Sequence, residues 1–361
     1  MERLLHHACL ELAKGFDVAV AGPAGCLEFV PSGAPAKECR LSPLPAFLAC
    51  LQWSALALSS SFKPQLVLAG SGVAAPAAIA AAWRSGAQAA CYLHGLDVIV
   101  ESAIYRAVFL PAVRRCDRLI ANSRYTAGLA ARAGIPPGKL AVLNPGAALP
   151  PAGVRGDAAA FRNALGAGDR PILLSVGRLH RRKGLAEFIE RSLPAVVRRF
   201  PGVLLAIVGG EPAAALRGGS GERARIAEAA ARAGMQAHVR FAGALDDALL
   251  ESAFAASRVL VFPVLDLPGD AEGFGMVAVE AAAHELPTVA FAVGGVPEAV
   301  EDGISGQLVQ PIDYAAFTEA VCGYLAGTVP FSPERCRAFS EEFSWERFGE
   351  RLRAICSAAM A

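Results

Sequence analysis

Two carboxylates flank a glycine-bounded turn in the last third of the chain. Glu272 lies in this turn, and Glu280 lies eight positions later in a helix-forming apolar segment that Pro287 ends. A helix N-terminus presents unpaired backbone N–H groups and a partial positive charge, which suit a bound diphosphate. Glu280 can accept hydrogen bonds from a vicinal diol. The competing interpretation is an acidic first turn that only stabilises its helix.

A second turn carries two cations. Arg178 and Lys183 follow the apolar strand expected over residues 172–176 and precede a helical segment at 185–199. Two cations on such a turn can neutralise a diphosphate while it is bound and while it leaves. The neighbouring Arg181 is interpreted as part of a solvated basic turn.

Polar residues also follow two apolar segments in the first half of the chain. His94 and Asp97 come after residues 89–93, and Ser123 and Arg124 come after a segment ending at Asn122. Ligands of open parallel sheets bind at the carboxyl ends of the strands. An ordinary loop histidine is the alternative for His94. Ser123 and Arg124 could contact a phosphate or the acceptor, and a purely structural role stays equally open for them.

Glycines end further strand candidates. Gly209 and Gly210 follow residues 203–208 and permit a close backbone approach to a ligand, although a plain tight turn is equally consistent. Residues 70–75 read Gly-x-Gly-x-x-Ala, which is typical of dinucleotide sites. The acidic residue expected about twenty positions later is absent, so we interpret this segment as helix–strand packing. A nicotinamide-dependent oxidoreductase is the functional alternative that it suggests.

Short apolar runs alternate with helical periods along the whole chain. This alternation predicts an α/β fold with parallel sheets covered on both faces. A segment rich in Pro, Gly and Ala, residues 145–168, is the expected interdomain linker. The expected strands are residues 17–21, 66–69, 89–93, 118–122, 140–143, 172–176, 203–208, 239–241, 259–262, 288–291 and 306–309.

The segment from Glu272 through Glu280, with Gly294-Gly295-Val296-Pro297-Glu298 after it, resembles the donor-site signature of retaining glycosyltransferase family 4. The resemblance runs over about residues 259–309. It implies the GT-B fold, in which two Rossmann-like domains with parallel sheets face each other across a cleft. The expected division is an acceptor-binding domain at 1–150, a nucleotide-sugar-binding domain at 151–340 and a helix at 341–361 that crosses back to the first domain.

The resemblance also implies a reaction and a set of site residues. A hexose passes from a nucleoside-diphosphate sugar, UDP- or GDP-linked, to an acceptor hydroxyl with retention and without a metal or a bound cofactor. His94 holds the transferred sugar, Asp97 orients the acceptor hydroxyl together with Ser123 and Arg124, and Glu272 contacts sugar hydroxyls. The donor-binding set comprises Arg178, Lys183, Gly209, Gly210, Glu272, Gly273, Phe274, Gly275, Met276, Val277 and Glu280.

The N-terminus departs from the family pattern. Members open with a strand and a glycine-rich turn, whereas residues 1–4 here look like the helix that follows that turn. One hypothesis is that the chain starts one strand late, and a genuine short start is the alternative. A catalytically impaired, glycosyltransferase-like scaffold is therefore a further functional alternative, because the absent glycines would face the donor phosphates.

The composition indicates the kind of partner and the cellular compartment. Residues 1–150 carry 13 basic and 8 acidic side chains, a bias that suits an anionic acceptor or membrane surface and is too weak for nucleic acid. Nine scattered cysteines without a Cys-x-x-Cys pair predict free thiols in a reducing compartment. We expect no metal site, no signal peptide and no membrane span, the best candidate being residues 66–83. These features favour a cytoplasmic enzyme. The family resemblance implies an acceptor at the inner face of the plasma membrane and a role in lipopolysaccharide or exopolysaccharide synthesis.

Overall fold

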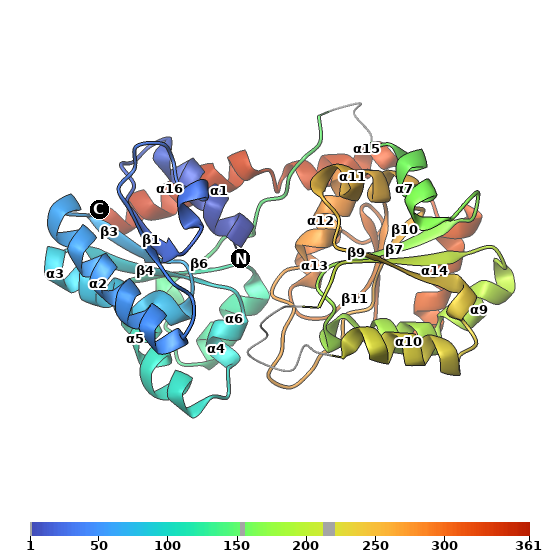
Figure 1. Cartoon of the computed structure of the whole chain (residues 1–361), viewed down its shortest axis with the longest axis horizontal. Coiled ribbons are helices and arrows are strands. Elements are labelled where there is room, and N and C mark those ends of the chain that lie inside the picture. Colours follow the sequence, from blue (N-terminus) through green and yellow to red (C-terminus); the bar gives the residue numbers. More distant parts are fainter. Residues whose placement is uncertain (1, 152–155, 212–220) are drawn as a thin grey trace. The chain divides into compact units, whose positions relative to one another are not determined.

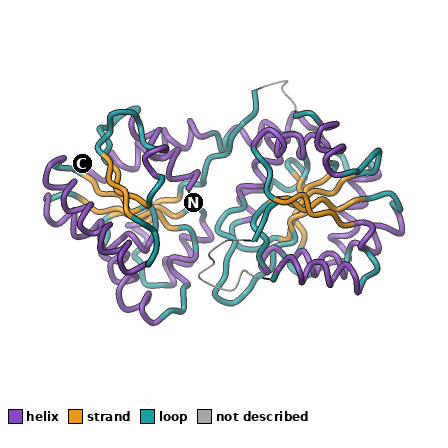
Figure 2. Tube along the Cα trace, viewed as in Figure 1, coloured by secondary structure: helices purple, strands orange, loops and turns teal. Residues whose placement is uncertain are grey.

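The computed structural model describes residues 2–151, 156–211 and 221–361. These residues form two compact units. The first unit contains residues 1–146 and 344–361 together with the short segment Gly269–Phe274, and the second contains residues 147–268 and 275–343. Each unit is a parallel sheet with helices on both of its faces (Figures 1 and 2).

The first unit is built on a four-stranded parallel sheet of order β3-β4-β5-β6. A separate parallel pair joins β1 to β2. Both chain ends lie in this unit, where the first and last helices pack together (Figure 1). Its elements are α1 (Glu2–Ala13), β1 (Val20–Pro23), β2 (Ala36–Cys39), α2 (Leu44–Phe62), β3 (Leu66–Ala69), α3 (Ala75–Ser85), β4 (Gln88–Leu93), α4 (Leu96–Ile99), η3 (Tyr105–Phe109), α5 (Leu110–Arg115), β5 (Arg118–Ala121), α6 (Arg124–Arg132), β6 (Leu140–Val142) and α16 (Trp345–Met360), with short 3₁₀ turns η1 (Cys26–Phe29), η2 (Gly72–Ala74) and η4 (Pro137–Lys139).

The second unit is built on a six-stranded parallel sheet of order β12-β11-β10-β7-β8-β9. Every residue of its strand β8 is buried, as expected for a strand covered on both faces. Its elements are α7 (Ala158–Leu165), β7 (Ile172–Val176), η5 (Arg181–Lys183), α8 (Leu185–Arg191), α9 (Leu193–Arg199), β8 (Leu204–Val208), α10 (Glu222–Arg232), η6 (Gln236–His238), β9 (Val239–Gly243), α11 (Asp247–Ala256), β10 (Val259–Phe262), α12 (Met276–Ala283), β11 (Thr288–Phe291), α13 (Val296–Ala299), β12 (Gly306–Val309), α14 (Tyr314–Ala326) and α15 (Pro333–Glu341).

The predicted α/β class with parallel sheets is confirmed, and differences are local. The expected linker at 145–168 contains helix α7, which Asp157 caps at the amides of Ala159 and Ala160 and which buries Phe161 in the core of the second unit. The expected helix at 185–199 is two helices, because Ser192 and Pro194 stand at the start of α9 and a proline ring disfavours the preceding turn. Strand β2 was not predicted; its residues Ala36–Cys39 are too short and polar to show an apolar run.

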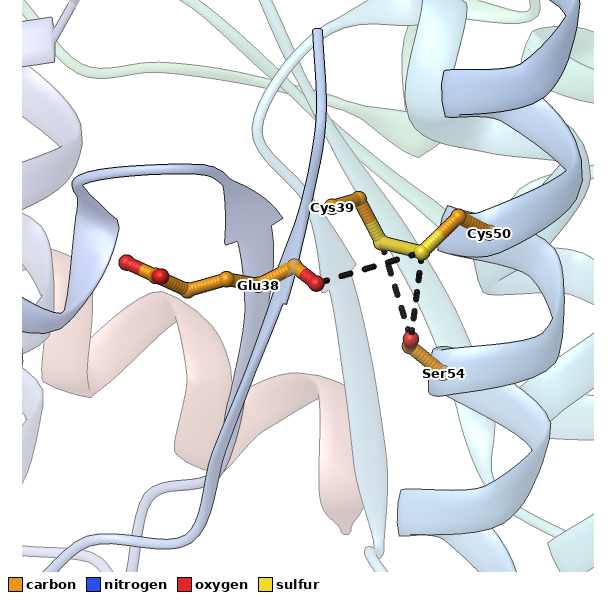
Figure 3. The surroundings of a disulfide bond; sticks show 4 residues. All are labelled: Glu38, Cys39, Cys50 and Ser54. Atoms are coloured by element: carbon orange, nitrogen blue, oxygen red, sulfur yellow. Dashed lines mark hydrogen bonds between the residues drawn. A yellow bond between two sulfur atoms is a disulfide. The ribbon is translucent and has the colours of Figure 1, made fainter.

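Two cysteines overturn the prediction that all nine thiols are free. Cys39, the last residue of β2, forms a disulfide with Cys50 in α2, and their Cα atoms are 5.7 Å apart (Figure 3). The hydroxyl oxygen of Ser54 lies 3.6 Å from the sulfur of Cys39. Sequence spacing did not predict the bond because only the tertiary structure brings β2 beside α2. The other seven cysteines are free.

The expectation on membrane spans also changes. Residues 66–83 divide into strand β3 and helix α3, so the predicted best candidate is not one helix. Among the described residues, α2 is the one helix that is long and apolar enough to cross a bilayer by length and composition alone. Its Phe47 and Leu51 nevertheless belong to a core cluster with Cys39 and Ala77, so α2 is part of the first unit.

Candidate functional site

In the first unit, polar groups gather at the carboxyl ends of neighbouring strands. The segment Gly70–Gly72 follows β3, His94 follows β4 and Asn122 follows β5. This edge of a parallel sheet is where open α/β folds bind ligands. The alternation of strand and helix places it there, because each strand delivers its following loop to the same edge.

A network of hydrogen bonds fixes His94. Its Nε2 lies 2.8 Å from the carbonyl oxygen of Gly70, and because a carbonyl can only accept, Nε2 carries the proton. Nδ1 is then the nitrogen that can accept a hydrogen bond. Burial lowers the pKa of His94 and so favours the neutral imidazole, although the charge of Asp97 opposes this effect.

Asp97 is buried and ties two loops together. Its Oδ2 accepts from the backbone N–H of His94 at 2.7 Å, and its Oδ1 accepts from the N–H of Gly72 at 2.9 Å. The carboxylate therefore holds the loop after β3 against the loop after β4. The Gly72 N–H, which a dinucleotide would use in the Gly-x-Gly-x-x-Ala pattern, is already bonded within the protein, as the packing interpretation of that segment requires.

Glu272, Gly273 and Phe274 belong to the segment that is grouped with the first unit. Ala271 of this segment lies in the core of that unit. A Cβ atom on Gly273 would come within 2.5 Å of the carbonyl oxygen of His94 and 2.6 Å of Asn122 Nδ2. Glycine is required at this position because the two backbones approach so closely. The tertiary structure thus places Gly273 directly against His94.

Two residues of this edge were missed by the sequence analysis. Asn122 is 6% exposed, and its Nδ2 donates to the carbonyl oxygen of His94 at 3.5 Å while its Oδ1 has no partner. Tyr105 is 8% exposed in the π-helical turn η3, and its hydroxyl, which also has no partner, lies beside Gly72. Burial first, and then the charge of Asp97, raise the pKa of Tyr105, so its hydroxyl stays protonated. A π-turn is a frequent marker of functional sites, but no sequence pattern predicts it.

Ser123 and Arg124 lie at the start of α6. The fully buried Ser123 hydroxyl accepts from the N–H of Thr126 at 3.0 Å and contacts the Thr126 hydroxyl at 3.2 Å. Ser123 is therefore the N-cap of the helix. The Arg124 side chain is exposed. Of this predicted acceptor-binding pair, only Arg124 presents its side chain to solvent.

In the second unit, two glycines bring the ends of β7 and β8 into direct contact. Gly177 has φ 141° and Gly209 has φ 124°, a region that favours glycine. A Cβ atom on Gly209 would collide with the carbonyl oxygen of Gly177. Gly210, next along the chain, is exposed, and its carbonyl oxygen accepts from the N–H of Leu179 at 3.0 Å.

Lys183 lies above this glycine turn. Its Nζ is 4.7 Å from the centre of the Phe262 ring, at the end of β10, and a Cβ atom on Gly177 would lie 4.0 Å from the same nitrogen. The side chain is half-buried. Arg178 is exposed, and its guanidinium forms no hydrogen bond or ion pair among the residues that the structure describes. The two cations thus differ, since the ring of Phe262 holds one of them in place.

The N-terminus of α12 lies against the same aromatic ring. The N-cap residue is Gly275, which has φ 104°, and no side chain caps the helix. A Cβ atom added to Gly275 would lie 3.1 Å from the Phe262 ring. The N–H groups of Met276 and Val277 therefore begin the helix without a side-chain acceptor, as an anion-binding terminus requires. Glu280 lies half-buried one turn later. Phe262, which the sequence analysis did not select, joins the Lys183 ammonium to this terminus.

Glu211 caps the start of a helix in the second unit. Its Oε1 accepts from the N–H groups of Gly221 and Arg223, both at 2.9 Å, at the start of α10. Residues 212–220 between them lie outside the described part of the chain. Across residues 2–151, 156–211 and 221–361, no group of three or more His, Cys, Asp or Glu side chains could hold a metal ion.

Two family descriptions match most of the chain. "Glycosyltransferase Family 4" matches residues 1–149, and "Glycosyl transferases group 1" matches residues 170–326. Curated relatives include a GDP-mannose-dependent α-(1-6)-phosphatidylinositol monomannoside mannosyltransferase of Mycolicibacterium smegmatis, 33% identical over 267 residues that cover 69% of this chain and 66% of the relative. A D-inositol 3-phosphate glycosyltransferase of Streptomyces scabiei is 34% identical over 258 residues, covering 69% and 55%. The matches thus span about half to two thirds of the relatives' length.

Solved structures share the whole architecture. Anabaena HepE in complex with UDP and glucose superposes with a TM-score of 0.76 at 20% identity, covering 98% of this chain and 96% of that chain. A glycosyltransferase from Rickettsia africae gives a TM-score of 0.79 at 16% identity, covering 99% and 94%. These likenesses establish the predicted GT-B fold.

Proposed function

The chain belongs to glycosyltransferase family 4, and from this premise we propose that it transfers a hexose from a nucleoside-diphosphate sugar to an acceptor hydroxyl with retention of configuration. One observation carries the proposal. Phe262 contacts both the Lys183 ammonium and the N-cap residue of α12, so a fixed cation and an uncapped helix terminus share one aromatic support. Both features stabilise a diphosphate, and both belong to the second unit.

The proposed step proceeds on one face of the sugar. The bond between the anomeric carbon and the diphosphate oxygen breaks, the acceptor oxygen bonds to that carbon from the same side, and the departing diphosphate receives the acceptor proton. Lys183, Arg178 and the N–H groups of Met276 and Val277 stabilise the charge on the leaving group. Glu280 binds the ribose diol. No metal is required in this scheme.

The first unit supplies the groups that handle the sugar and the acceptor. The neutral His94 imidazole offers Nδ1 as an acceptor for a sugar hydroxyl, and Glu272 binds other hydroxyls of the same sugar. Asp97 and Arg124 serve the acceptor, and the Ser123 hydroxyl keeps α6 in place beside them. The acceptors in the names of the two relatives, phosphatidylinositol monomannoside and D-inositol 3-phosphate, are anionic polyols.

The basic bias of residues 1–150 supports an acceptor of the same chemical class, a phosphorylated polyol or a lipid-linked saccharide. We place the reaction on the cytoplasmic side of the membrane. An enzyme of envelope glycolipid synthesis would use such an acceptor. A role in lipopolysaccharide or exopolysaccharide synthesis is consistent with an acceptor of this class.

Binding of nucleotides tests the donor site directly. We expect UDP or GDP to raise the midpoint of thermal unfolding, because a ligand at a hundredfold excess over its Kd stabilises the folded state by about 2.7 kcal/mol. Lys183→Ala removes a charged contact to phosphate and should weaken binding roughly 10- to 100-fold. Glu280→Ala should weaken the binding of nucleosides and of nucleoside diphosphates to the same extent, since Glu280 contacts the ribose that both contain.

Arg181→Ala is the matched control, because Arg181 is an exposed cation of the same turn. It should bind nucleotide as the unchanged chain does. Equal losses in Arg181→Ala and Lys183→Ala would reduce the site to general basic charge, and absence of stabilisation by UDP, GDP and ADP would contradict the proposal. The anomeric configuration of the product, read by NMR, tests retention separately.

A further inference from the structure

Helix α2 (Leu44–Phe62) presents an uncharged face that the candidate site does not use. The helix contains no charged side chain. Phe47, Leu51 and Ser59 are buried on its inner side. Pro45, Ala49, Trp53 and Ala57, spaced four residues apart, are exposed and therefore form one outer stripe. Trp53 is 75% exposed at the centre of this stripe.

The inner side of α2 keeps the helix in the first unit. Phe47 and Leu51 pack in a cluster with Cys39 and Ala77, and the disulfide joins Cys50 of the helix to Cys39 of β2 (Figure 3). A bilayer-spanning position would expose these core side chains and separate the helix from β2. The outer stripe is therefore available for contact while α2 lies along the surface of its unit.

Cations surround the outer stripe. Arg40 precedes the helix, Lys63 is its C-cap, and both side chains are exposed. The guanidinium of Arg84 donates from Nε to the Ser60 hydroxyl at 2.9 Å, which places a third cation beside the end of the stripe. No acidic residue occurs in the sequence between Glu38 and Asp97. The region therefore combines an apolar centre with positive charge at both ends.

We propose that the outer stripe of α2 binds the surface of an anionic lipid bilayer, with the helix axis parallel to the membrane. Tryptophan places its ring at the level of the headgroups, and the flanking cations attract anionic lipids. A second copy of the chain fits less well, since antiparallel pairing of two α2 helices would bring Arg40 of one close to Lys63 of the other. The choice of a bilayer as partner rests on the proposed function, in which the acceptor is lipid-linked.

Cosedimentation with vesicles tests the surface. The unchanged chain should bind vesicles of phosphatidylcholine with phosphatidylglycerol, and should bind pure phosphatidylcholine at least about tenfold more weakly. Trp53→Glu, and separately the pair Arg40→Gln with Lys63→Gln, should each lower partitioning onto anionic vesicles on the order of tenfold. Ile312→Glu is the matched control, because Ile312 is 66% exposed in the second unit, and it should bind as the unchanged chain does.

Tryptophan fluorescence locates the contact. Emission should shift to shorter wavelength on anionic vesicles, and the shift should persist in Trp83→Phe but be lost in Trp53→Phe while binding continues. Equal vesicle binding by the unchanged chain and Trp53→Glu, or no binding by either, would overturn the proposal. A concentration-dependent dimer that Trp53→Glu abolishes would assign the stripe to a second copy instead and would also overturn it.

The test separates this proposal from the proposed function. Thermal stabilisation by UDP or GDP should be the same in Trp53→Glu as in the unchanged chain, which also shows that the variant is folded. Vesicle binding without nucleotide binding would leave the surface standing and contradict the transferase proposal. Nucleotide binding without vesicle binding would support the transferase proposal and overturn the membrane-binding surface.

Discussion

At the scale of single residues, Asp97 shows how one carboxylate can organise a site edge. Its two oxygens accept from the N–H groups of His94 and Gly72, which belong to different loops. The family resemblance assigned His94 to the transferred sugar and Asp97 to the acceptor hydroxyl. It did not predict that both carboxylate oxygens would be bonded to backbone amides, because Gly72 is remote in sequence. The role of Asp97 toward the acceptor hydroxyl stays a prediction.

Asp97→Asn should destabilise the fold and impair transfer. The amide retains one acceptor oxygen but places an NH₂ group against a backbone N–H, so one buried donor loses its partner. We expect the free energy of unfolding to fall by about 1–3 kcal/mol. We also expect kcat/KM to fall, because the main-chain position of His94 is no longer fixed. Urea unfolding and steady-state kinetics measure the two effects.

Tyr105→Phe provides the comparison for this variant. The Tyr105 hydroxyl is buried in the same network but has no partner, so its removal should leave the stability unchanged or slightly higher. A large loss of stability in Tyr105→Phe would mean that the hydroxyl is bonded in solution. An Asp97→Asn chain as stable as the original would refute the role of Asp97 as a clasp between loops.

At the scale of elements, α1 and α16 are held together across the two ends of the chain. The Arg353 guanidinium donates to the Glu11 carbonyl oxygen at 2.7 Å and to its carboxylate at 3.0 Å. Glu11 is buried, and Gly349 allows the helices to approach closely, since a Cβ atom there would collide with the Glu11 side chain. The apolar sides of both helices share a cluster that includes Leu4 and Leu352.

Arg353→Met should therefore destabilise the first unit. Removing one partner of a buried ion pair leaves an uncompensated charge, but Lys14 also contacts Glu11 at 2.7 Å and moderates the loss. We expect the free energy of unfolding to fall by roughly 2 kcal/mol, below the usual range for buried pairs. Arg351→Met, on the exposed side of the same helix, is the control. Adding Glu11→Gln to Arg353→Met should restore part of the loss, and a further loss of stability would contradict this account.

At the scale of the whole molecule, three histidines in two units share one electrostatic property. Burial lowers the pKa of His7, His94 and His284 below the ordinary value of 6.5. Well above pH 6.5 these groups are neutral in both the folded and the unfolded chain, so they cost no stability. As the pH falls below 6.5, the unfolded chain takes up protons more readily than the folded one.

The free energy of unfolding should consequently decrease between pH 6.5 and pH 5. His94→Gln should flatten this dependence, because it removes one of the groups that titrate differently in the two states. Burial opposes ionisation of Glu187, but hydrogen bonds from Arg225 outweigh it and lower the pKa of this carboxyl below 4.5. The stability that the ionised Glu187 contributes is lost only below pH 4.5, outside the range from pH 6.5 to pH 5. Urea unfolding at several pH values provides the test, and an identical slope in His94→Gln would contradict it.

The sequence alone determined the class of fold, the family and most strand positions. Strands β7, β10 and β11 begin and end where their predicted runs do, and nearly all of their residues are buried, as expected for strands covered on both faces. Strands β3 and β12 also have their predicted bounds, although they are partly exposed. The motif around Glu272 and Glu280 identified the family because its residues are close together in the chain. The spacing of residues along the chain is therefore enough to predict the fold class, the family and these strand positions.

Only the tertiary structure decided which distant residues meet. It joined Cys39 to Cys50, bonded Asp97 to Gly72, grouped Gly273 with His94, and placed Phe262 between Lys183 and the N-terminus of α12. These contacts depend on strand order and on the packing of helices against the sheets. Neither is encoded by the spacing of residues within a single motif, since each pairing arises when separate segments of the chain pack against each other.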